Sequence, residues 1–123
     1  MLREAQHERV HRVLRTLLSS CPGVVVAVVA NKEGVTLACE PDDPRADAVS
    51  RAGTAVLALA EGAALELEAG QVSQVVVRAA KGHLVVQQVS AANALAVYCA
   101  ANAALGGVLV EVATAVKGLS GVV

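Results

Sequence analysis

The segment Val24–Ala30 consists only of Val and Ala, without a polar residue. Its length and β-branched content are typical of a β-strand, and a strand of this kind is buried on both faces. A sheet that contains such a strand needs other elements packed on each side of it. The motif Asn31–Gly34 predicts a tight turn in which Gly34 supplies a positive φ angle. We therefore expect Val35–Cys39 to return as an antiparallel neighbour.

Apolar residues recur at helical spacing in the first and last parts of the chain. The first helix is predicted over about residues 2–20 and is ended by Pro22-Gly23. The last helix begins at about Leu105 and has Gly106-Gly107 in its first turn. The two apolar stripes are Val10, Val13, Leu14, Leu17, Leu18 and Cys21, and Leu105, Val108, Leu109, Val112, Val116 and Leu119.

A long middle helix is predicted from Asp43-Pro44 to about Leu65. Asp43 suits the cap position, and Pro44 suits the first turn. The main stripe, expected to face the core, is Val49, Ala52, Val56, Leu59, Ala60 and Ala63. The opposite face is Asp47, Thr54, Leu57, Ala58, Glu61 and Leu65. Because that face is only half polar, the helix is expected to have a second surface to cover.

Three more strands follow, at Gln71–Arg78, His83–Val89 and Ala94–Ala100, and the short turns between them predict an antiparallel meander. The order of elements is helix, two strands, helix, three strands, helix. We therefore predict one α+β domain over residues 1–123, with a five-stranded, mainly antiparallel sheet and helices on its faces.

Composition limits the classes of partner. Hydrophobic residues make up 55% of the chain, Tyr98 is the only aromatic residue, and the formal net charge is −1. Without a basic surface or side chains for base stacking, we expect no nucleic-acid partner. No uninterrupted apolar run approaches the roughly 20 residues of a membrane span, so no membrane insertion is predicted. Cys21, Cys39 and Cys99 match no metal or redox spacing, which favours buried free thiols in a cytoplasmic protein.

The segment His7–His11 matches the zinc-protease motif H-E-x-x-H, with Glu8 in the position of the general base. A zinc hydrolase built on these residues is a distant alternative. Leu14 and Leu17 stand where an extended motif has a glycine and a third histidine, and no second helix follows to supply another ligand. We therefore expect a solvated helix flank without a metal.

No phosphate-binding glycine loop or nucleophile elbow occurs in the sequence. Asp42 and Asp43 are better explained by helix capping and dipole compensation than by acid–base chemistry. His83 is interpreted as a polar turn residue. We predict no catalytic residue and no cofactor.

The strand Gln71–Arg78 alternates Val72, Gln74 and Val76 with Ser73, Val75 and Val77. At a sheet edge, its open backbone groups would favour pairing with a second chain. The half-apolar face of the middle helix favours the same kind of contact.

The ordered pattern resembles the roadblock family, which includes dynein light chains and bacterial gliding regulators. The features that carry the resemblance run along nearly the whole chain. They are the amphipathic first helix, Pro22-Gly23 before Val24–Ala30, the turn Asn31–Gly34 with Val35–Cys39, the Ala-rich middle helix, Gly70-Gln71-Val72, Lys81-Gly82 before His83–Val89, Asn93–Ala100, and Leu105-Gly106.

The resemblance implies a profilin-like sheet with strand order 2-1-5-4-3 and no catalytic activity. It also implies homodimers that pair the third strand and pack the middle helices together. The implied contact residues are Thr54, Leu57, Ala58, Glu61 and Leu65 on the helix, and Val72, Ser73, Gln74, Val75, Val76 and Val77 on the strand. The implied partner is a Ras-like small GTPase, which the dimer regulates or scaffolds. A structural assembly adaptor without a GTPase partner is the alternative.

Overall fold

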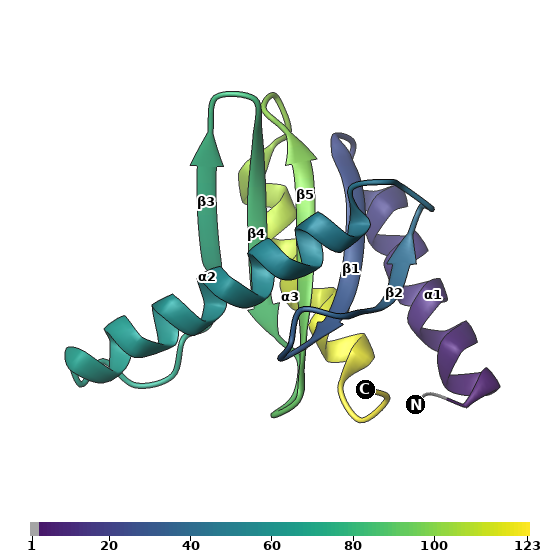
Figure 1. Ribbon diagram of the computed structural model, residues 1–123. Helices are drawn as coiled ribbons and strands as arrows, with labels where there is room; N and C mark the ends of the chain where they lie inside the picture. Colours follow the sequence, from purple (N-terminus) through teal and green to yellow (C-terminus); the bar gives the residue numbers. More distant parts are fainter. Residues whose placement is uncertain (1–2) are drawn as a thin grey trace.

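Five strands form one sheet in the order β2-β1-β5-β4-β3, and each neighbouring pair is antiparallel (Figure 1). The computed structural model describes residues 3–123. Its strands are β1 Val24–Asn31, β2 Thr36–Glu40, β3 Val75–Ala79, β4 Gly82–Gln88 and β5 Asn93–Ala100. Its helices are α1 Glu4–Ser20, α2 Ala46–Glu66 and α3 Leu105–Leu119. The predicted fold class, element order and strand order are confirmed.

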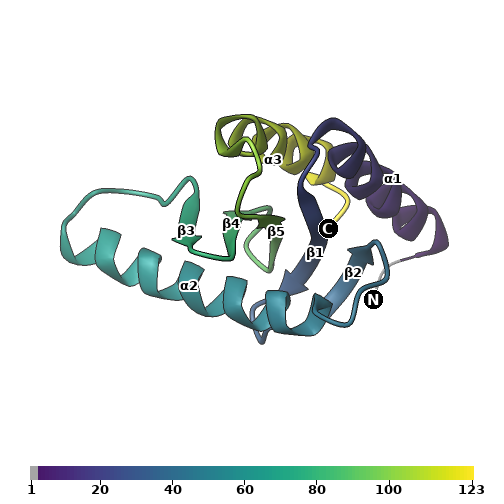
Figure 2. The same cartoon turned by 90° about the horizontal axis from the view of Figure 1, so that it is seen from above.

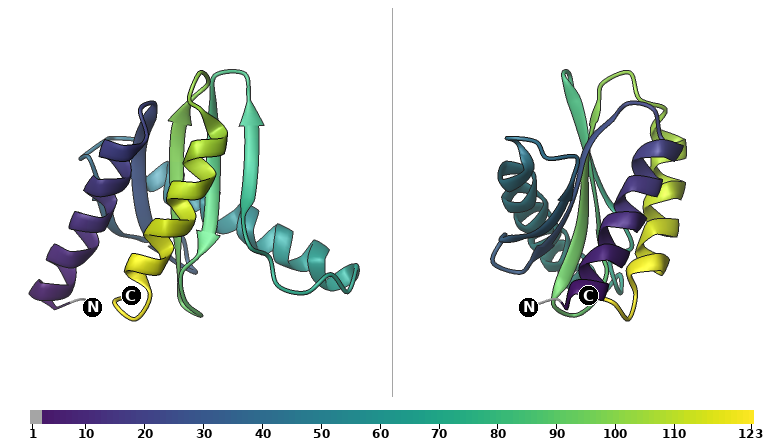
Figure 3. Two further views of the ribbon diagram at one scale, coloured as in Figure 1. Left: turned by 180° about the vertical axis from the view of Figure 1, so that it is seen from behind. Right: turned by 90° about the vertical axis from the view of Figure 1, so that its right-hand side faces the viewer.

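The sheet is covered on both faces. α1 and α3 lie together on one face, and α2 crosses the other face (Figures 2 and 3). Two separate apolar clusters result, one on each side of the sheet. The central strand β1 contributes to both. Residues 26–30 are buried as predicted, whereas Val24 and Val25 are half-buried. Aliphatic side chains such as Leu14, Leu95 and Leu119 fill the space that aromatic rings occupy in most cores.

The turn after β1 has the predicted form. Gly34 has a φ of 79°, a region that side chains other than glycine's rarely adopt. The side-chain oxygen of Asn31 accepts hydrogen bonds from the N–H groups of Glu33 and Val35, both at 3.0 Å. These bonds explain why the sequence turns here rather than extending the strand.

Two predicted element starts were wrong. α2 begins at Ala46, because Pro44 and Arg45 form a turn before the helix. The carboxylate of Asp43 accepts from the Arg45 N–H at 2.8 Å within that turn. β3 begins at Val75 rather than Gln71. The Gln74 side-chain amide donates to the Gln87 side chain and to the Leu109 carbonyl, both at 2.8 Å, so residues before Val75 are held by side-chain contacts instead of a strand ladder.

The predicted assignment of faces on α2 was wrong for most of the core stripe, although Val49 faces the sheet as predicted. The residues that face the sheet are Ala46, Val49, Ser50, Gly53 and Leu57. Leu59 is 76% exposed, and Leu57, predicted to face outward, is 7% exposed. The physical reason lies at Gly53, where an added Cβ would be 2.7 Å from the Ala96 Cβ. α2 turns this small residue toward the sheet and so approaches it closely.

By length and composition alone, α2 is also long and apolar enough to be a candidate membrane span. No such segment was predicted from the sequence. One such helix is weak evidence for a membrane. α2 packs across the sheet through Val49 and Leu57.

His83 is not a turn residue. It lies in β4 and is 7% exposed. Its Nδ1 lies 3.3 Å from the Ala79 N–H, and its Nε2 lies 3.1 Å from the Ala101 carbonyl. Nδ1 therefore accepts and Nε2 donates, which is the pattern of a neutral imidazole. This histidine ties the β3–β4 turn to the segment after β5 and has a structural role.

The three cysteines are free thiols. Burial raises the pKa of each thiol, and the carboxylates of Asp42 and Glu40 raise that of Cys39 further. Cys21 and Cys99 are buried, whereas Cys39 is half-buried. Because thiolate is the reactive form, we expect slow labelling of the native protein, at Cys39 first.

Titration with a chromogenic disulfide at pH 8 should show at most about one reactive thiol in native protein and three in urea. Cys39→Ser should remove the native reaction and leave two thiols in urea. Rapid native labelling of two or three thiols would contradict the observed burial.

Candidate interaction surface

β3 is an edge strand with one open side. Among the described residues it pairs only with β4, and hydrogen-bonded pairs alternate along an antiparallel ladder. The two-residue turn after Ala79 closes on a hydrogen-bonded pair. Val75 and Val77 therefore direct their backbone groups to β4, while Val76 and Arg78 direct theirs outward. Val76 and Val77 are 37% and 38% exposed.

The C-terminal half of α2 projects past β3, beyond the edge of the sheet (Figures 1 and 2). We call residues 58–66 the overhang. Leu59 and Leu65 are 76% and 80% exposed, and Leu67, just after the helix, is 76% exposed. The overhang therefore places large apolar side chains in solvent beside the open edge of β3.

A shallow groove of about 310 Å³ lies between the other half of α2 and the sheet. We call it the α2 groove. Its walls are mostly apolar or small residues, with Tyr98 and Arg45 as the polar groups. The lining is Arg45, Ala48, Val49, Ala52, Val77, Ala79, Gly82, Leu84 and Tyr98.

Arg45 is held in place at the groove. Its Nε and Nη2 donate to the two Asp43 carboxylate oxygens, both at 3.0 Å. Its guanidinium lies 5.7 Å from the centre of the Tyr98 ring, within the range of a cation–π contact. The hydrogen bond from Arg45 lowers the pKa of the Asp43 carboxyl, so both groups are charged at neutral pH. Nη1 is left for a further acceptor.

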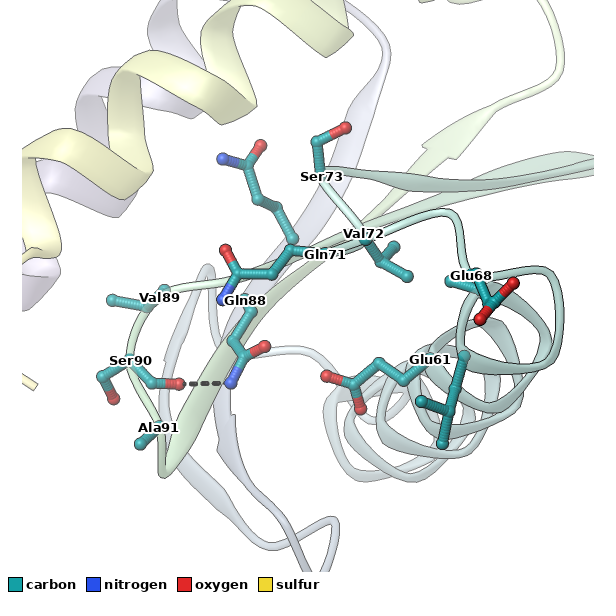
Figure 4. Close-up of a pocket in the computed structure, with 13 residues that line it drawn as sticks. Glu61, Glu68, Gln71, Val72, Ser73, Gln88, Val89, Ser90 and Ala91 are labelled. Carbon is teal, nitrogen blue, oxygen red and sulfur yellow. Dashed lines mark hydrogen bonds between the residues drawn. The ribbon is translucent and has the colours of Figure 1, made fainter.

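A larger open hollow of about 1000 Å³ lies below the overhang. Its labelled side chains come from α2, from the segment between α2 and β3, and from the end of β4 and the turn after it (Figure 4). They are mainly polar, among them Glu61, Gln71 and Gln88, and the Gln88 amide donates to the Ser90 carbonyl at 2.8 Å. No group of three His, Cys, Asp or Glu residues in the described chain is placed to hold a metal ion.

The histidines of the H-E-x-x-H match make a different contact. His7 and His11 stack with their ring centres 6.2 Å apart. His11 Nδ1 lies 2.6 Å from a Glu40 carboxylate oxygen, which also accepts from Arg15 at 3.2 Å. His11 of the motif thus connects α1 to β2.

The predicted contact residues fall into two groups. Val75, Val76 and Val77 lie in the edge strand, and Val72, Ser73 and Gln74 precede it. On α2, Ala58, Glu61 and Leu65 are exposed. Thr54 instead donates to the Asn31 carbonyl at 3.2 Å, and Leu57 is buried.

Arg45, Ala48 and Tyr98 were not predicted from the sequence as parts of a contact surface. Ala52, Leu59 and Ala63 were predicted on the core side of α2, although all three are exposed. Their spacing of seven and four residues correctly indicated that the three residues lie on one side of a helix. The direction in which that stripe points was not readable from the spacing.

Comparisons with known proteins agree with this architecture. A family model described as the Roadblock/LC7 domain matches residues 12–106. No curated protein sequence matches significantly.

Three solved structures are similar. The Roadblock/LC7 domain from Streptomyces avermitilis has 24% identity and a TM-score of 0.81, covering 88% of this chain and 92% of that one. The gliding protein MglB from Thermus thermophilus has 21% identity and a TM-score of 0.88, covering 99% and 93%. MglB from Myxococcus xanthus has 17% identity and a TM-score of 0.83, covering 98% and 90%. At these identities the likeness shows the fold, and the family model shows the family. The chain belongs to the Roadblock/LC7 domain family.

Proposed function

We propose that the protein is a non-catalytic, self-associating regulator or scaffold of a Ras-like small GTPase, acting in the cytoplasm. The observation that carries the proposal is the open β3 edge next to the exposed apolar overhang of α2. The GTPase as partner rests on the roadblock family resemblance. Similarity to the gliding proteins supports a regulatory role.

Self-association is proposed to pair β3 of one copy with β3 of another across a two-fold axis. Such pairing satisfies the outward backbone groups of Val76 and Arg78 in both copies at once. The same symmetry brings the two α2 helices together on one face of the joined sheet. One similar structure is described as MglB with a tetrameric arrangement, so that protein itself forms oligomers.

The predicted interface includes the edge residues Val75, Val76 and Val77 and the segment Val72–Gln74 before them. The predicted contact residue Leu57 is buried. We propose instead that α2 contacts the second copy through its exposed side beside the groove and along the overhang, which carries Ala52 and Leu59. A stable dimer of standard size would bury roughly 1,600 Å² in total.

The GTPase proposal predicts a nucleotide-dependent complex. A small GTPase encoded near this protein should bind the purified protein more tightly when loaded with a non-hydrolysable GTP analogue than with GDP. We expect at least a roughly tenfold difference in Kd, measured by isothermal titration or interferometry, because a regulator must discriminate between the two states.

The control is the same GTPase with a substitution that abolishes nucleotide binding. Equal affinity for both nucleotide states would favour a structural assembly adaptor. Failure to bind any neighbouring small GTPase, together with an intact dimer, would reject the GTPase proposal and leave self-association standing.

A further inference from the structure

Two histidine rings lie side by side on α1. His7 and His11 are four residues apart, the spacing at which helical side chains become neighbours. Their ring centres are 6.2 Å apart, and the two ring planes differ by only 17°. Both residues are half-buried, so water and small ions can reach the rings.

Glu40 fixes which nitrogen of His11 carries the proton. Its carboxylate oxygen lies 2.6 Å from His11 Nδ1. Because an ionised carboxylate only accepts hydrogen bonds, Nδ1 must be the donor. In the neutral ring the lone pair is then on Nε2. The same carboxylate oxygen accepts from Arg15 at 3.2 Å, which helps to hold Glu40 and the His11 ring in place.

This arrangement has the features of a metal-binding histidine pair. Histidines that bind metals donate one ring N–H to a carboxylate, which orients the ring and makes the other nitrogen more basic. Two imidazoles one turn apart can bind the same ion from a single helix. Within residues 3–123, neither nitrogen of the His7 ring has a hydrogen-bond partner, so its lone pair is available as well.

We propose that His7 and His11 form a binding site for a divalent transition metal ion of the zinc, copper and nickel class, in which Glu40 positions His11. Imidazole nitrogen suits these ions, whereas magnesium and calcium require oxygen ligands. The described chain brings no group of three metal-binding side chains together, so water fills the remaining coordination positions. The site binds the ion reversibly and has no catalytic role.

The bound ion would join two turns of α1 and, through Glu40, tie them to β2. The same helix buries Val10, Leu14 and Leu17 in the core. Zinc should therefore stabilise the packed position of α1, because a ligand that binds only the folded state shifts the unfolding equilibrium. β2 and β3 are opposite edges of the sheet (Figure 2), so the site is separate from the surface proposed for self-association.

The proposal departs from the expectation of a helix flank without a metal. The H-E-x-x-H match supplied two histidines and no third ligand. Glu40 is 29 residues from His11 and belongs to a strand, so its contact with the helix could not be predicted from the spacing of the motif. Glu8, which stands in the position of a general base, is exposed and takes no part in this site.

Zinc titration of protein purified without a polyhistidine tag tests the site. Isothermal titration calorimetry should find one Zn²⁺ per wild-type chain. His7→Gln or His11→Gln should raise the dissociation constant by roughly a hundredfold, because the second metal–nitrogen bond of a chelate forms within one molecule. Glu40→Gln should raise it about tenfold, because the charged partner of His11 is lost. Glu8→Gln is the matched control and should bind zinc as the wild type does.

Nitrogen-15 NMR of the histidine rings distinguishes metal binding from a structural role. Zn²⁺ should shift a ring nitrogen of His7 and the Nε2 of His11, and it should leave the buried His83 unchanged. In Glu40→Gln, the shift at His11 should require more zinc. Cys39→Ser should keep the binding, which excludes the half-buried thiol as a ligand. Circular dichroism without zinc checks that each variant is folded.

The outcomes are distinct. Equal zinc affinity of the wild type, His7→Gln and His11→Gln would show an adventitious ion only and would overturn the proposal, as would the absence of binding. Equal affinity of the wild type and Glu40→Gln would overturn the positioning role of Glu40. Loss of binding in Glu8→Gln would place the ion on a different set of ligands.

Discussion

Replacing Val76 by proline is expected to give a folded monomer. The backbone groups of Val76 point away from β4, so the proline ring removes a donor that the isolated chain does not use. In a dimer paired through β3, the donor is lost in both copies and two acceptors stay unsatisfied. With about 1–3 kcal/mol for each of the two unsatisfied groups, the dissociation constant should rise at least roughly thirtyfold. Light scattering coupled to size exclusion at tens of micromolar measures the change.

Val77→Pro is the matched control. Its N–H is directed to β4, opposite Leu84, so proline there breaks the internal ladder. We expect Val77→Pro to unfold at a lower urea concentration than the wild type. Val76→Pro should unfold at nearly the same urea concentration as the wild-type monomer. If Val76→Pro stays dimeric, β3 does not form the interface.

Most of the fold could be predicted from the sequence because each element has its own periodicity and its own boundary residues. Val24–Ala30 could only be a buried strand, and Asn31–Gly34 could only be a turn of positive φ. The order in which the five strands pair is different. Which strand neighbours β1 depends on contacts between distant segments, and that order came from the family resemblance.

The orientation of α2 could not be predicted, because hydrophobicity does not decide it. Alanine lies on every side of this helix. The buried side includes Ser50, whose hydroxyl lies 2.6 Å from that of Thr36, and Gly53, which fits against Ala96. Ser50, whose hydroxyl has a hydrogen-bond partner, and Gly53 therefore face the sheet, whereas Leu59 faces solvent.

The candidate interaction surface was likewise predictable from the sequence only in part. An open edge at Val75–Val77 followed from strand alternation and the strand order. The α2 groove did not, because Arg45 and Tyr98 are far apart in the sequence and meet only when α2 crosses the sheet beside β5.

Leu57 and Leu59 provide the direct test of this orientation. Leu57 is 7% exposed in the cluster between α2 and the sheet. Leu57→Glu places a carboxylate among Val49, Val86 and Ala96, which we expect to destabilise the fold by about 3 kcal/mol or more. Urea unfolding, followed by circular dichroism at a protein concentration below the dimer dissociation constant, isolates this effect from self-association.

Leu59→Glu makes the same chemical change two residues along, at a side chain that is 76% exposed. The stability of the single chain should change by less than about 0.5 kcal/mol, since no buried contact is lost. Self-association should weaken strongly, because Leu59 lies on the side of α2 that is proposed to contact the second copy and two copies of the new charge enter the interface. The opposite result would be a stable monomeric Leu57→Glu protein and an unaffected Leu59→Glu dimer. It would mean that α2 contacts its partner through the face that carries Thr54, Leu57 and Leu65.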